Sequence, residues 1–176
     1  MAKPETGIPG ATVGHGHLKV ADLERAIAFY RDVIGMKVMM LYKDQAAFLS
    51  FDDYHHHLGL NTWESLAGSP PPYGHTGLYH IAFVFPDRKT LGQVIHRVRN
   101  AGYKLTGAAD HGVSEAVYLN DPDGNGLELY RDRPKAEWPS LENGDISIIN
   151  APLDVEAIVA EGQAVREKAD SAQFVN

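Results

Sequence analysis

An internal repeat constrains the fold more than any other feature of the sequence. His80 follows His15 by the same number of residues as Asp87 follows Asp22, and the segments GHLKVAD and YHIAFVFPD occupy matching places. Such self-similarity is typical of a supersecondary unit that occurs twice in one chain. The chain is therefore expected to contain two similar halves.

The first half is predicted to be a strand, a helix and three strands. Alternating residues from Val13 to Val20 indicate the first strand. Asp22 is a candidate N-cap, and apolar residues recur at helical spacing as far as Gly35, a typical helix terminator. Three strand candidates separated by turn residues follow, in the segments MKVMMLY, AAFLSFD and HHHLGLNTW.

The second half repeats this order. A helix is predicted from about Arg88 to Asn100, ending before Gly102, and strands are predicted in YKLTGAA, EAVYLND and NGLELYR. The prediction is an α+β fold with two tandem βαβββ modules in one domain, residues 11–133. Module one spans 11–63, a linker rich in proline and glycine spans 64–77, module two spans 78–133, and a C-terminal extension with a helix spans 134–176.

Composition excludes several function classes. The net charge is −7 and no Lys/Arg cluster is present, which argues against a nucleic-acid partner. No apolar run approaches the ~20 residues that span a bilayer, and the first residues lack the apolar stretch of a signal peptide, so no membrane partner and a cytoplasmic location are expected. Because the chain has no cysteine, any metal ligands must be His, Asp or Glu.

Histidine is the abundant reactive residue, with nine in the chain. His15 and His80 lie on the first strand of their modules, and Glu128 lies on the last strand between two leucines. Burying a carboxylate there without a cation would be costly. These residues are therefore predicted to be the protein ligands of one divalent metal.

Two βαβββ modules with a His on each first strand and Glu128 on the last strand resemble the vicinal oxygen chelate superfamily. This superfamily includes glyoxalase I, fosfomycin-resistance proteins, bleomycin-binding proteins and extradiol dioxygenases. The resemblance covers roughly residues 11–133, and DLERAIAFYRDVIGM and DPDGNGLEL are typical of it. It implies that the modules form one curved mixed-sheet domain around a metal cleft, and that the protein is a homodimer.

A narrower resemblance, to extradiol dioxygenases, comes from residues 109–128. Their signature is matched at His111, Val117-Tyr118, Asp121-Pro122, Gly124 and Glu128, whereas Ala109 departs from the residues usual at its position. The histidine-rich segment and the proline-rich segment before His80 also resemble small catechol 2,3-dioxygenase-like members. The implied function is an Fe(II)-dependent extradiol dioxygenase that cleaves a small aromatic diol with O2.

The resemblance also implies roles for individual residues. His111 would hydrogen-bond the bound substrate or oxygen, and Tyr118 would orient the substrate. The acid/base histidine aligns with His56, whereas strand parity from Gly59 favours His57, so both stay candidates. Gly59 stands where glyoxalase I-like members have a fourth metal ligand.

Three alternatives remain open. Two His and one carboxylate leave positions free for a chelating substrate and O2, as in non-haem Fe(II) oxygenases, but Mn(II), Ni(II), Co(II) or Zn(II) also bind such ligands. A lyase, isomerase or thiol transferase would polarise a chelating substrate without O2. A protein that sequesters a small molecule is the non-enzymatic alternative, although its known examples lack the three ligands.

Overall fold

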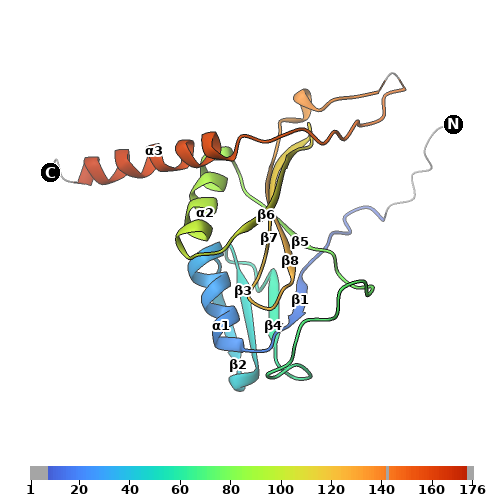
Figure 1. Cartoon of the computed structure of the whole chain (residues 1–176), viewed down its shortest axis with the longest axis vertical. Helices are drawn as coiled ribbons and strands as arrows, with labels where there is room; N and C mark the ends of the chain where they lie inside the picture. Colours follow the sequence, from blue (N-terminus) through green and yellow to red (C-terminus); the bar gives the residue numbers. More distant parts are fainter. Residues whose placement is uncertain (1–7, 142, 174–176) are drawn as a thin grey trace.

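The computed structural model describes residues 8–141 and 143–173 and contains two four-stranded sheets flanked by helices (Figure 1). The ends of the N-terminal segment and of the predicted C-terminal extension lie outside the described residues. In the described part, no helix is long and apolar enough to cross a membrane.

The two sheets have the same strand order, in which the first and last strands of each module pair in parallel and the others pair antiparallel. This confirms the predicted α+β fold and the repeat. Sheet one contains, in order, β1 (Gly16–Lys19), β4 (Leu58–Asn61), β3 (Ala46–Ser50) and β2 (Lys37–Tyr42). Sheet two contains β5 (Ile81–Val84), β8 (Gly126–Asp132), β7 (Ser114–Asn120) and β6 (Leu105–Asp110).

Each module has one helix after its first strand, and each helix has an aspartate N-cap, as predicted for Asp22. The Asp22 carboxylate accepts from a backbone amide at the start of α1 (Leu23–Ala28), and the Asp87 carboxylate does so at the start of α2 (Arg88–Asn100). The structure differs from the single first helix expected, because α1 continues as a π-helix over Phe29–Ile34. There the amides of Gly35 and Met36 both donate to the carbonyl of Tyr30, which widens the last turn.

A helix outside the repeat, α3 (Val155–Gln173), packs across α2. The two helices approach so closely at Gly92 and Gly162 that a Cβ at either position would collide with the backbone of the other helix. Figure 1 shows α3 running away from the sheets beyond this crossing. Two short 3₁₀ turns, Lys43–Gln45 and Lys135–Glu137, complete the described elements.

One hydrophobic core joins the modules. Buried side chains from both sheets, α1, α2 and α3 form a single cluster. The buried hydroxyl of Tyr30, in the π-helix, donates to the Asp121 carboxylate of module two over 2.9 Å. The first strands also meet, because a Cβ at Gly16 would lie 3.0 Å from Ile81 Cδ1. The residues that precede these two are His15 and His80.

Candidate metal-binding and catalytic site

Module two brings two of the three predicted metal ligands together. Glu128 lies in the middle of β8, opposite Ala82 of β5 and Tyr118 of β7. His80 immediately precedes β5, and its Nε2 lies 3.0 Å from Glu128 Oε2. His80 and Glu128 therefore form a pair near the N-terminal end of β5.

Tyr118 and His111 extend this pair into a hydrogen-bonded chain. The Tyr118 hydroxyl donates to Glu128 Oε1 over 3.1 Å and lies 2.7 Å from His111 Nε2. Burial raises the pKa of Tyr118 to about 12, and the Glu128 carboxylate adds to the rise. The phenol therefore keeps its proton at neutral pH.

A backbone carbonyl sets the tautomer of His111. The carbonyl oxygen of Ile149 lies 3.0 Å from His111 Nδ1, and since a carbonyl only accepts, Nδ1 carries the proton. Nε2 of the neutral ring is then an acceptor. The single hydroxyl proton of Tyr118 consequently lies between two acceptors, His111 Nε2 and Glu128 Oε1.

The C-terminal extension holds the turn that carries His111. The amide of Ile149 donates to the His111 carbonyl over 3.1 Å, and Ala151 forms an isolated β-bridge with Asp110. Gly112, at φ +75°, lies directly under Pro139 and Ile149. Sequence reasoning missed this contact, because residues so far apart in the chain show no pattern that links them.

Module one contributes His15 and His56. Their ring centroids lie 4.4 Å apart, and the His56 ring stands edge-on to Phe48 of β3 at 5.0 Å. Burial lowers the pKa of His56, as do the nearby imidazoles of His15 and His55, so the neutral ring is favoured. The structure thus places one acid/base candidate beside a predicted metal ligand.

His57, the other acid/base candidate, lies elsewhere. Its Nδ1 is 2.8 Å from the hydroxyl of buried Ser50, and its ring lies near those of Phe51 and Tyr54. These contacts hold the turn between β3 and β4. Strand parity favoured His57, and its backbone does continue the pairing of β4 with Leu49 and Gly16, but its ring is held by Ser50 whereas the His56 ring lies beside His15.

Two imidazoles and a carboxylate are suitable ligands for a divalent metal, and two of the three predicted ligands, His80 and Glu128, already lie together. Among residues 8–141 and 143–173, no three His, Asp or Glu side chains converge closely enough to hold a metal ion. The buried His80 Nδ1 has no hydrogen-bond partner, so the ring has only its Nε2 engaged. His15 directly precedes Gly16, which lies close to Ile81 of module two, but the His15 ring lies against that of His56. The triad stays a prediction that requires His15 to reorient.

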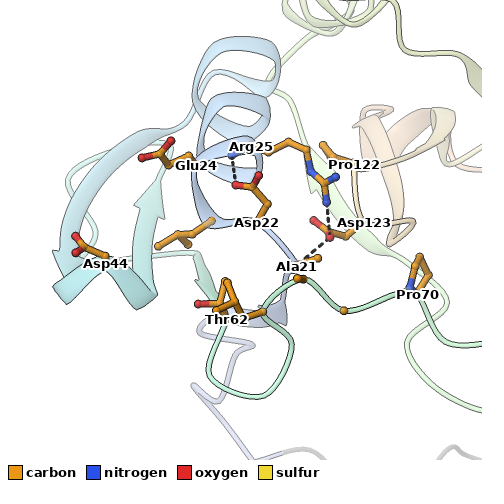
Figure 2. A pocket seen from close by; sticks show the side chains of 13 residues that line it. Ala21, Asp22, Glu24, Arg25, Asp44, Thr62, Pro70, Pro122 and Asp123 are labelled. Atoms are coloured by element: carbon orange, nitrogen blue, oxygen red, sulfur yellow. Dashed lines mark hydrogen bonds and ion pairs between the residues drawn. The ribbon is translucent and has the colours of Figure 1, made fainter.

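The pocket in Figure 2, of about 570 Å³, lies apart from this chemistry. It is formed where the start of α1 meets the loop before β8. Asp123 Oδ1 accepts from the amide of Ala21 over 2.9 Å and from Arg25 Nη2 over 2.7 Å, as the dashed lines show. The contacts join the two modules, and none of the predicted ligands lines this pocket.

Comparison with known proteins agrees with this arrangement. The family model of the Glyoxalase/Bleomycin resistance protein/Dioxygenase superfamily matches residues 12–129, and the chain belongs to this superfamily. The chain is 40% identical over 149 residues to a catechol-2,3-dioxygenase of Bacillus subtilis, covering 85% of this chain and 51% of that one. It is 34% identical over 131 residues to biphenyl-2,3-diol 1,2-dioxygenase 3 of Rhodococcus globerulus, covering 68% of this chain and 63% of that one. The chain thus spans between half and two-thirds of these relatives.

Two further similarities concern shorter proteins. A lactoylglutathione lyase of Haemophilus influenzae is 28% identical over 127 residues, which cover 68% of this chain and 91% of the lyase. The crystal structure of a glyoxalase/dioxygenase from Nostoc punctiforme superposes with a TM-score of 0.61 at 21% identity, covering 76% of this chain and all of that one. This last likeness bears on the fold alone.

Proposed function

We propose that the protein is a metal-dependent extradiol dioxygenase that uses O2 to cleave a catechol-type aromatic ring. The observation that carries the proposal is the continuous chain from His111 through Tyr118 and Glu128 to His80. The dioxygenase relatives support the substrate class, since both are named for aromatic diols. The homodimer and the cytoplasmic location stay predictions.

His15, His80 and Glu128 would hold the metal, with Fe(II) preferred over Mn(II), Ni(II), Co(II) or Zn(II) because of the reaction. Fe(II) held by these residues would supply the chemistry that binds a chelating diol together with O2 and passes electrons between them. A catechol chelates through both oxygens, so three protein ligands leave room for diol and O2. A fourth protein ligand would remove that room.

The residues of module two are suited to move a proton from the substrate. His111 Nε2, the Tyr118 oxygen and Glu128 Oε1 share a single proton. One more proton, taken from a substrate hydroxyl onto His111 Nε2, would give each hydrogen bond in the chain its own donor. Tyr118, protonated at neutral pH, orients a substrate oxygen beside Glu128.

His56 is the proposed acid/base on the opposite side of the site. It stands beside His15, burial lowers its pKa, and its Nδ1 lies 2.7 Å from His55 Nδ1, whereas His57 is held by the hydroxyl of buried Ser50. A neutral imidazole with a free nitrogen can accept the second substrate proton and return it to the product.

A lyase or isomerase of the glyoxalase type is the second candidate. This candidate is favoured by the similarity to lactoylglutathione lyase. The alignment covers that lyase almost completely but covers only half of the catechol-2,3-dioxygenase. Gly59 argues against it, because the predicted fourth ligand of that chemistry has no side chain here.

The test is anaerobic reconstitution with Fe(II), followed by a catechol and air. We expect the yellow absorbance of a ring-opened semialdehyde, with turnover reduced about 100-fold or more in Tyr118→Phe and His111→Ala. Tyr73→Phe, in the exposed linker, is the matched control and should keep full turnover. Glu128→Gln should lose most of its metal. The second candidate would be supported if the protein bound metal tightly, gave no colour with several catechols and isomerised a hemithioacetal instead.

A further inference from the structure

The two sheets place different side chains at equivalent positions. In sheet two, one row across β5, β8 and β7 consists of Ala82, Glu128 and Tyr118. In sheet one, the corresponding row across β1, β4 and β3 consists of His17, Gly59 and Phe48. In sheet two the small residue, Ala82, lies on β5 and faces the large Glu128 on β8. In sheet one the large residue, His17, lies on β1 and faces Gly59 on β4.

The His17 ring fills the space above Gly59. A Cβ at Gly59 would lie 2.8 Å from both Cγ and Nδ1 of His17, closer than real Cβ atoms approach other atoms. The His17 Nε2 lies 3.0 Å from Nδ2 of Asn61, which holds the ring in place. Trp63 and Phe48 pack on the ring with centroid distances of 5.8 and 5.9 Å. The ring is therefore fixed on three sides.

The repeat shows what a carboxylate at position 59 would do in the absence of this ring. Glu128 reaches His80, which lies two residues before Ala82. His15 lies two residues before His17 in the same way. A glutamate at position 59 would therefore have the relation to His15 that Glu128 has to His80, provided that position 17 were as small as Ala82.

We propose that His17 is a specificity-determining residue that keeps a fourth carboxylate ligand out of the metal site. Its imidazole, held by Asn61 over Gly59, occupies the space that such a ligand would need. The site is thereby kept at three protein ligands and stays open to a chelating diol and O2. This inference rests on the proposed function, because it presupposes a metal at His15, His80 and Glu128.

The experiment compares Co(II) binding in four proteins under anaerobic conditions: wild type, His17→Ala, Gly59→Glu and the double variant. Co(II) is the probe, because its visible spectrum reports the coordination number. We expect Co(II) affinity within about threefold of wild type in each single variant. The double variant should bind Co(II) at least about tenfold more tightly, because a charged ligand is added, and should bind catechol more weakly. Gly77→Glu, which adds a carboxylate in open space, is the matched control.

Two results would overturn the proposal. If Gly59→Glu alone matched the double variant in Co(II) affinity, His17 would be no barrier. Alternatively, the double variant could bind Co(II) no better than wild type, which would mean that position 59 does not address the metal. A wild type that binds no Co(II) would instead refute the proposed function.

Stability measurements test the steric half of the proposal without any metal. Gly59→Ala should lower the midpoint of urea unfolding in the wild-type background, where the new Cβ meets the His17 ring. The same substitution should have a smaller effect in the His17→Ala background. Equal effects in both backgrounds would overturn the steric argument, even if the variants with glutamate fail to fold.

Discussion

Glu115→Gln should destabilise the protein more than the loss of any surface ion pair. Glu115 lies on β7 and is only 3% exposed, yet it is surrounded by three arginines. Its carboxylate accepts from Arg88 Nε at 2.9 Å, Arg131 Nε at 2.8 Å and Arg133 Nη2 at 3.3 Å. This one carboxylate therefore links α2, β7, β8 and the segment after β8.

The expected loss follows from the charges that remain. An uncharged amide would leave three partly buried guanidinium groups facing each other, and removal of one partner from a buried ion pair costs about 3–5 kcal/mol. Arg88 and Arg133 keep other carboxylate partners, Glu161 and Asp110, so the lower end, about 3 kcal/mol, is expected. In a chain of this length, that corresponds to a fall in Tm of roughly 6–12 °C.

Urea unfolding at pH 7 and thermal melts would measure this loss. Glu156→Gln is the matched control, because Glu156 pairs with Arg99 at 2.8 Å but its side chain is 77% exposed, and such a pair contributes about 1 kcal/mol or less. The reasoning would be refuted if the two variants lost the same stability. It would also be refuted if 1 M salt abolished the difference, since salt screens exposed charges far more than buried ones.

Three further changes test local features. Asp87→Ala removes the N-cap of α2 and should lower the free energy of unfolding by about 1 kcal/mol at pH 7. Backbone hydrogen bonds lower the pKa of Asp87 from its usual 3.8. The contribution of the cap is therefore complete above pH 3.8 and is lost as the pH falls through the lowered pKa. Urea unfolding of wild type and variant at falling pH should show the difference in stability between them disappearing. Tyr30→Phe leaves buried Asp121 without one of its donors and should cost about 1–3 kcal/mol by the same assay, whereas an unchanged midpoint would contradict the link between the modules. Gly112→Ala and Gly144→Ala both place a side chain at positive φ, but only the new Cβ at position 112 also meets a proline ring, at 2.8 Å. Thermal melts should therefore show the larger loss of stability for Gly112→Ala. Equal losses would argue against close packing of Pro139 and Ile149 on Gly112.

The sheets were predictable from the sequence because strand alternation and the repeat are both local patterns. The intervals from His15 to His80 and from Asp22 to Asp87 predicted two equivalent modules, and the strand pairing confirms them. The leucines on either side of Glu128 are buried, as the pattern indicated. The π-helix was not predictable, because an α-helix and a π-helix bury the same apolar positions over so short a segment.

The parts of the site that depend on orientation were harder to predict. His56 and His57 are adjacent in the sequence, and their different neighbours, His15 for the one and Ser50 for the other, are visible only in the folded structure. The tautomer of His111 depends on a carbonyl far along the chain, which no local pattern reveals. The steric role of His17 was not predictable, because it depends on the residue that faces it across the sheet, Gly59.

The contact between Ile149 and His111 means that the metal ligands and the control of the His111 tautomer lie in different parts of the sequence. The predicted metal ligands and every side chain of the hydrogen-bonded chain from His111 to His80 lie before residue 133. The segment that packs on the turn at Gly112, and the carbonyl that faces His111 Nδ1, lie after it. In a protein cut back to residue 133, water would replace that carbonyl, so His111 would be free to change tautomer while all the predicted metal ligands were present. Binding of a metal and readiness for proton transfer are thus separable properties of this fold.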